Sequence, residues 1–123
     1  MAWCAVPWHW SACNKASNLA ETAATEAGRL YPANTLHNGK GDAFRHCYWN
    51  ALMVIEIGEG KAKSIANNHE KGGKGREKEM DLKNNARGRT IGKNASGKNK
   101  GQKRNDAKND CKAAADSGQL VVL

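Results

Sequence analysis

The densest group of chemically useful side chains in the sequence lies within residues 41–53. Asp42 and His46 are four residues apart, so on a helix they would lie one turn apart on the same face. A carboxylate in that position can orient an imidazole and raise its basicity, or the two groups can share a metal ion. Arg45 lies beside this pair, where a cation can bind an anionic substrate or stabilise charge that develops in a transition state. The same residues also fit a structural arrangement, in which Asp42 caps its own helix and His46 is hydrogen-bonded in the interior.

A second polar group follows at residues 69–85. If the helices that carry the two groups pack side by side, His46, Glu70 and Asp81 can converge in one cleft. Carboxylates with an amide are ligands for Mg²⁺ or Ca²⁺, whereas two histidines with a carboxylate would suit Zn²⁺. No compact metal-binding motif is present, so this convergence alone predicts a divalent cation site, for Mg²⁺ or Ca²⁺ rather than Zn²⁺. The expected catalytic residues are Asp42, Arg45, His46, His69 and Glu70, and the expected metal ligands are Asp42, Glu70, Asp81 and Asn85.

The positive charge of the chain lies entirely in its second half. The formal net charge is +8, but residues 1–60 hold four basic and five acidic side chains, whereas residues 61–123 hold sixteen basic and seven acidic ones. Such a block indicates a polyanionic partner, which can be nucleic acid, an anionic membrane surface or an anionic cell-wall polymer. The residues expected to bind the substrate are Arg87, Arg89, Lys93, Lys98 and Lys100.

The apolar pattern predicts a mainly α-helical, single-domain bundle of four or five helices. The length of 123 residues suits one domain, and the longest apolar run, 51–55, is far shorter than the roughly 20 residues that a membrane crossing needs. Apolar residues recur with helical spacing, so we expect helices over 14–31, 42–57, 59–70, 77–90 and 105–115. The expected organisation is an irregular tryptophan-rich lid (1–13), a helical core (14–92), a basic loop that cannot order itself alone (93–104), and a C-terminal helix and tail (105–123) whose last four residues form a strand or pack on the core.

Four cysteines in a small basic chain suggest disulfides. Three pairings are possible, and we favour Cys4–Cys13 with Cys47–Cys111, the second of which would staple the two halves of the chain together. The alternative is four reduced, buried thiols in a cytosolic protein. Residues 1–13 lack the pattern of a signal peptide, so an exported form would be a mature module or the cargo of a dedicated machine.

Residues 37–92 carry a combination of short motifs. They are HNGKGDAFRH at 37–46, WNALM at 49–53, HE at 69–70, MDLKNN at 80–85 and GRTIG at 88–92. Together they resemble an uncharacterised bacterial domain family found at the C-termini of wall-associated, RHS-type and other polymorphic-toxin proteins, and as small secreted effectors. The resemblance implies a toxin-like hydrolytic module that is secreted or delivered into other cells. It implies that the family's polar positions are Asp42, Arg45, His46, His69, Glu70, Asp81 and Asn85.

Three functions follow from these observations. The favoured one is an antibacterial, metal-dependent nuclease, in which carboxylates hold the cation, His46 deprotonates water and the basic half binds the phosphodiester backbone. The second is a secreted hydrolase of envelope lipid or peptidoglycan, phospholipase-like or lysozyme-like, with Asp42 and His46 as a water-activating dyad. The third is a non-enzymatic cationic antimicrobial or nucleic-acid-binding protein. A toxin would require an acidic immunity protein in its producer, and we expect the chain itself to be a monomer.

Overall fold

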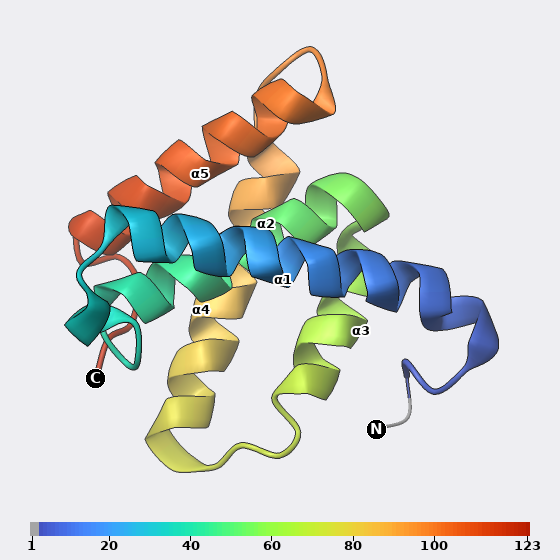
Figure 1. Cartoon of the computed structure of the whole chain (residues 1–123), viewed down its shortest axis with the longest axis horizontal. Helices are drawn as coiled ribbons and strands as arrows, with labels where there is room; N and C mark the ends of the chain where they lie inside the picture. The colour runs from blue at the N-terminus through green and yellow to red at the C-terminus, as the bar shows by residue number, and fades with distance from the viewer. Residues whose placement is uncertain (1–2) are drawn as a thin grey trace.

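The computed structural model describes residues 3–123, which form an all-helical domain with no strand in that range (Figure 1). The expected α-helical bundle is therefore confirmed. Two short 3₁₀ helices accompany the five α-helices. In chain order the elements are η1 (Pro7–His9), α1 (Trp10–Leu30), η2 (Ala33–Thr35), α2 (Lys40–Ile57), α3 (Glu59–His69), α4 (Gly75–Asn94) and α5 (Lys100–Asp116).

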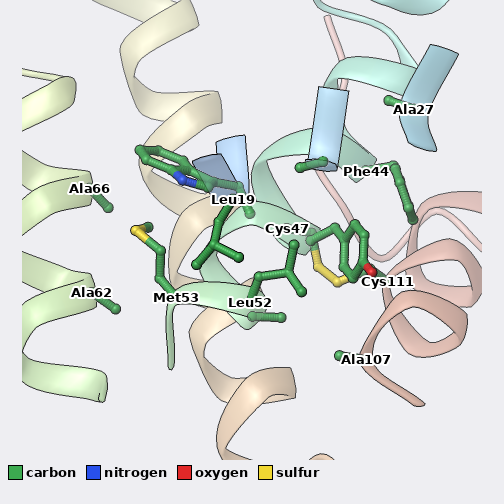
Figure 2. Close-up of a cluster of buried hydrophobic side chains, with 14 of the residues drawn as sticks. Leu19, Ala27, Phe44, Cys47, Leu52, Met53, Ala62, Ala66, Ala107 and Cys111 are labelled. Atoms are coloured by element: carbon green, nitrogen blue, oxygen red, sulfur yellow. A yellow bond between two sulfur atoms is a disulfide. The ribbon is translucent and has the colours of Figure 1, made fainter. Parts of the chain in front are cut away.

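Helix α2 is the central element of the fold. It contacts each of the other four α-helices, and its contact with α4 is the most extensive. A helix surrounded by others must be apolar on most of its circumference, and α2 contributes the fully buried Phe44, Leu52 and Met53 to the core (Figure 2). Small alanines of α1 and α3, among them Ala23 and Ala66, pack against it without exposure to solvent. Polar side chains that α2 carries toward its partners are consequently buried as well.

Two glycines allow α4 to cross α2 at very short range. A Cβ added at Gly88 would overlap the carbonyl oxygen of Cys47 and lie 2.8 Å from its Cα atom. At Gly92 an added Cβ would lie 2.7 Å from the carbonyl oxygen of Ala51. Any larger residue at these two positions would force the helices apart, because the opposing atoms belong to the backbone of α2. This close crossing brings the polar residues in the first half of α4 against those of α2.

Both expected disulfides are present. Cys4–Cys13 ties the N-terminal segment to α1, and Cys47–Cys111 joins α2 to α5 (Figure 2). No cysteine is left free. Disulfides persist in oxidising compartments, so they are compatible with a secreted protein. Within residues 3–123, no helix is long and apolar enough to cross a membrane.

The prediction of a basic loop at residues 93–104 is wrong. Helix α4 continues to Asn94 and α5 begins at Lys100, so that only residues 95–99 connect them. The side chain of Asn99 caps α5 by accepting the backbone N–H of Gln102. Arg104 then pairs with Glu56 of α2 at 2.9 Å. Tertiary contacts thus order a segment whose own apolar content is too low to do so.

The N-terminal end differs from expectation in where its irregular segment stops. That segment ends at His9 rather than at residue 13, and residues 1–2 of the expected lid lie outside the described residues. Trp8 and Trp10 are 81% and 56% exposed, so these two indoles do not pack on the core. At the other end, packing on the core, the second of the two expected alternatives, is confirmed for Leu120, which is buried, and residues 120–123 form no strand. The backbone N–H of Leu123 donates to the carbonyl oxygen of Asn38.

Candidate active site

Three helices bring the two polar groups of the sequence together. Asp42 and His46 lie on the first half of α2, Glu70 directly follows α3, and Asp81 lies in the second turn of α4. The Nε2 atom of His46 is 3.5 Å from Asp81 Oδ1 and 3.9 Å from Glu70 Oε2. His46, Asp42 and Glu70 are each more than 90% buried. The convergence expected of His46, Glu70 and Asp81 is therefore found in the structure, whereas the roles of these residues stay predictions.

Asp42 fixes the orientation of the imidazole. The Nδ1 atom of His46 lies 3.1 Å from both the carbonyl oxygen and the Oδ1 atom of Asp42. The other carboxylate oxygen accepts the backbone N–H of Asn38 at 2.8 Å, and Arg45 donates to Oδ1 at 2.7 Å. With Nδ1 and both Asp42 oxygens engaged, the Nε2 edge of the ring faces the carboxylates of Glu70 and Asp81. Asp42 is not the N-cap of its helix, because α2 begins two residues earlier.

The buried charges shift one another's protonation. Burial opposes ionisation of Asp42, but the hydrogen bonds from His46 and from the backbone of Asn38 hold its pKa well below the usual range. Burial would lower the pKa of His46, yet the hydrogen bond to Asp42 and the charge of Asp81 outweigh it and raise that pKa. Burial raises the pKa of Asp81, and the negative charges of Glu70 and Asp42 add to the effect. The cluster thus combines three carboxyl groups with one imidazole and with the Arg45 guanidinium that pairs with Asp42.

A chain of hydrogen bonds through two asparagine side chains holds the Glu70 carboxylate. Asn85 on α4 donates to Glu70 Oε2 at 3.3 Å, and its own amide oxygen accepts a 2.9 Å hydrogen bond from Asn50. Arg89 donates to the Asn50 oxygen at 3.0 Å. Asn50 is absent from the expected site residues, although its position one turn after His46 is a signal that it shares the same helix face. These hydrogen bonds fix the position of the Glu70 carboxylate inside the protein.

The cluster contains groups that could hold a cation. Asp42, His46 and Asp81 each offer one ligand atom, and these three atoms lie within 4.8 Å of one another. The Oδ1 atom of Asp81 is buried and accepts no hydrogen bond from the described residues. A buried carboxylate oxygen without a donor is unusual, because desolvation of such an atom is costly unless a partner replaces water.

A cavity of about 500 Å³ adjoins the cluster between α1, α2 and α3. Its wall includes His46 and Arg45, so the imidazole that faces the carboxylates also borders the cavity. Most of the remaining wall is apolar. It consists of Ala16, Ala20, Trp49, Ile65 and the Cys4–Cys13 disulfide, with Ser17, Asn68 and His69 as polar members. Sequence patterns could not reveal this cavity, because residues of three helices and of the N-terminal segment form it together.

The comparisons with known proteins place the chain in a family. Residues 3–119 match the model of a family described as Domain of unknown function (DUF6973). The chain belongs to this family. No solved structure matches it. The match extends beyond residues 37–92, which carry the motifs, and includes the N-terminal tryptophans and α5. The resemblance of residues 37–92 to polymorphic-toxin domains stays a prediction.

Several residues expected in the site of this DUF6973 protein lie elsewhere. His69 is exposed and packs edge-on against Trp49, with ring centroids 5.3 Å apart, so it borders the cavity rather than the carboxylate cluster. Lys93 is twelve residues beyond Asp81 on the same helix, a distance of about 18 Å at 1.5 Å per residue. Most of the expected substrate-binding residues have protein partners: Arg87 binds Gln119, Arg89 binds Asn50, Lys93 pairs with Glu59, and Lys100 pairs with Glu56, while Lys98 is exposed between α4 and α5.

Other cations of the DUF6973 domain lie closer to the cluster. Lys71, Lys74, Arg76 and Lys78 occupy the segment that connects Glu70 to the first turn of α4. Within residues 3–123, none of these four has a carboxylate within 4.0 Å. Residues 71–78 therefore present positive charge that no ion pair among the described residues neutralises, next to Glu70 and ahead of Asp81 in the chain.

Proposed function

We propose that this protein is a secreted, metal-assisted hydrolase of phospholipids that cleaves a carboxylic ester next to His46. The cavity carries the proposal, because it is largely apolar yet has His46 and Arg45 in its wall. An acyl chain held in such a cavity would place its polar end beside the imidazole, and Arg45, whose side chain is 40% exposed, would bind the phosphate. Of the functions expected from the sequence, an envelope-lipid hydrolase accounts for this wall best.

The residues around His46 support a role as general base. Asp42 holds the Nδ1 side of the ring, which leaves Nε2 to accept the proton of an attacking water. The water oxygen adds to the acyl carbon, and the proton passes from Nε2 to the alcohol oxygen that leaves. Arg45 binds the phosphate near this reaction and stabilises the negative charge that develops. The products are a fatty acid and a lysophospholipid.

Asp81 and Glu70 would hold a divalent cation in this proposal. The Asp81 Oδ1 atom, which accepts no hydrogen bond from the described residues, and the amide-fixed Glu70 carboxylate suit Mg²⁺ or Ca²⁺, which prefer oxygen ligands. Asn85 would fix Glu70 rather than bind the ion, and Asp42 would orient His46 because its two oxygens are already engaged. When bound, the cation would offset the carboxylate charges, which favours the neutral imidazole, and would stabilise negative charge on the ester.

A metal-dependent nuclease is the second candidate. It is favoured by the four free cations at residues 71–78, which flank Glu70 and Asp81 and can bind a phosphodiester backbone. The same base and carboxylates would act on phosphorus instead of an acyl carbon. In either case delivery to a target cell and an acidic immunity protein remain part of the proposal rather than of the described structure.

A product assay tests both candidates. The protein is incubated with phosphatidylglycerol vesicles, with single-stranded RNA and with plasmid DNA, each in Mg²⁺, Ca²⁺ or EDTA. We expect fatty acid release that requires a cation and falls at least 100-fold in His46→Gln. The matched control is His37→Ala, which removes an imidazole that is 83% exposed and should change nothing. Nucleic acid cleavage without fatty acid release would favour the nuclease, and no product from any substrate would refute both.

A further inference from the structure

Two tryptophans near the N-terminus are exposed in a rigid segment. Trp8 and Trp10 are the most exposed large hydrophobic residues in the described chain, at 81% and 56%. The Cys4–Cys13 disulfide anchors the segment that carries Trp8 to α1, and Trp3 and Cys4 of this segment pack against the core. Trp3 also stacks on His9 with ring centroids 3.6 Å apart and an interplanar angle of 8°. The structure therefore holds two indoles in solvent, where an aromatic side chain without a partner is unfavourable.

Cations lie beside the N-terminal segment that carries Trp8. A cavity of about 410 Å³ is lined jointly by the N-terminal segment and by residues of α3 and its C-terminal end, including Lys71. Lys63 is one turn before Asn67, another residue of that cavity wall, so Lys63 lies on the same side of α3. Both lysines are exposed. We name Trp8, Trp10, Lys63 and Lys71 the tryptophan–lysine face, because the N-terminal segment and the C-terminal end of α3 border the same cavity.

No exposed acid offsets this charge nearby. Residues 3–20 contain no acidic side chain, and residues 60–76 contain only Glu70, which is buried. Glu59 lies at the start of α3, at the opposite end of that helix from Lys71, and it is paired with Lys93. Indoles are favoured at the level of lipid headgroups, and lysines near a surface of anionic lipid are attracted to it. An anionic bilayer thus complements both the apolar and the charged parts of the face.

The face is physically linked to the cavity beside His46. The Cys4–Cys13 disulfide forms part of the cavity wall and also anchors the segment that carries Trp8. Asn68 borders both cavities, so they adjoin each other. A bilayer that contacts the two tryptophans would therefore lie next to the apolar cavity. A lipid leaving that bilayer could reach His46 without exposing its acyl chain to a long aqueous path.

We propose that the tryptophan–lysine face docks the protein on anionic lipid bilayers and presents the cavity to them. This inference rests on the proposed phospholipid substrate. A single nucleic acid strand also combines stackable bases with negative charge, but the apolar wall of the adjoining cavity favours lipid.

Vesicle binding tests the docking surface separately from catalysis. Cosedimentation with phosphatidylglycerol vesicles and with phosphatidylcholine vesicles is measured for the wild type, for Trp8→Ala/Trp10→Ala and for Lys63→Gln/Lys71→Gln. We expect the wild type to bind the anionic vesicles at least tenfold more tightly than the neutral ones. Each double variant should lose at least tenfold of that affinity while its melting temperature stays unchanged.

The matched control is Lys83→Gln/Lys103→Gln, which removes two exposed lysines elsewhere on the protein and should bind vesicles like the wild type. A short-chain phosphatidylglycerol below its critical micelle concentration supplies the second readout, because its hydrolysis needs the site but no membrane. The tryptophan variant should hydrolyse it at the wild-type rate. Unchanged vesicle binding by the tryptophan variant, or binding to single-stranded oligonucleotide in preference to vesicles, would overturn the docking proposal. Failure of the wild type to hydrolyse the monomeric lipid would count against the proposed function and leave the vesicle result to be judged by itself.

Discussion

Replacing Gly88 by alanine tests how closely α4 must cross α2. The added Cβ would overlap the carbonyl oxygen of Cys47 and lie 2.8 Å from two other backbone atoms of that residue. Backbone atoms cannot rotate away as a side chain can, so the helices would have to separate by about 1 Å. Because His46 and Asp81 lie on the two helices, their 3.5 Å approach would be lost with the crossing.

The size of the effect follows from two opposing contributions. Overpacking a close contact costs about 1–3 kcal/mol and sometimes more, and a clash with backbone belongs at the upper end, at about 3 kcal/mol. Alanine is better than glycine in a helix interior by about 1 kcal/mol. The net expectation for Gly88→Ala is a loss of about 2 kcal/mol in the free energy of unfolding. For a chain of this length that corresponds to a melting temperature lower by about 8 °C.

Thermal unfolding followed by circular dichroism measures this directly. The matched control is Gly28→Ala on α1, where an added Cβ meets nothing within 4 Å. That variant has the helix-propensity gain of about 1 kcal/mol without the clash, so its melting temperature should rise by about 4 °C. If Gly88→Ala melted at or above the wild-type temperature, the close crossing of α2 and α4 would be refuted. A folded Gly88→Ala protein should also lose most of any activity that requires His46 and Asp81 together.

Three further predictions concern the disulfides, acid stability and the cation. Replacing Cys47 and Cys111 by serine opens a loop of 64 residues and should lower the free energy of unfolding in urea by about 4 kcal/mol. Replacing Cys4 and Cys13, which are nine residues apart, should cost less. A larger loss from the Cys4–Cys13 pair would contradict the loop-closure account. The hydrogen bond from Arg29 outweighs burial and holds the pKa of Glu26 at about 2, against 4.5 in the unfolded chain. The ionised Glu26 therefore stabilises the folded protein above pH 4.5, and this stabilisation is lost as the pH falls toward 2. Glu26→Gln should therefore be about 1 kcal/mol less stable than the wild type at pH 7 and equal to it near pH 2, and a pH-independent difference would show that the ion pair is not the cause. Adding Ca²⁺ or Mg²⁺ at 100 times its Kd to chelator-treated protein should raise the free energy of unfolding by about 2.7 kcal/mol. The Asp81→Asn variant should show no such increase. An equal increase in the wild type and in Asp81→Asn would refute the cation site.

Local patterns in the sequence were sufficient to locate the helices. The repeat of Ala16, Leu19, Ala23 and Ala27 predicts the buried face of α1, and the same four residues are buried in the structure. Such patterns work because a helix that packs on a core must place apolar residues every three or four positions. They fail at residues 93–104, because apolar periodicity reports neither the local cap of Asn99 nor the pairing of Lys100 and Arg104 with the distant Glu56.

The candidate site divides in a similar way. The spacing of Asp42 and His46 is a local property, so the sequence could place them on one helix face. That Glu70 and Asp81 join them depends on how three helices pack. Nothing in the order of residues indicated the cavity or the distance of Lys93 from the site.

The sequence by itself determined the helical class and the residue types that can do chemistry, and it favoured one of the three possible cysteine pairings. The helical class and the Asp42–His46 pair follow from composition and from spacing along one helix, because the relevant interactions join neighbours in the chain. Only the tertiary structure decided which of the sixteen cations in the second half of the chain lie near the site and which are neutralised by acids of the first half. It also decided that a largely apolar cavity adjoins His46 and that two tryptophans face solvent. Both depend on the angles at which helices cross, and the glycines of α4 set the closest of these crossings through contacts with backbone 41 residues away in the chain.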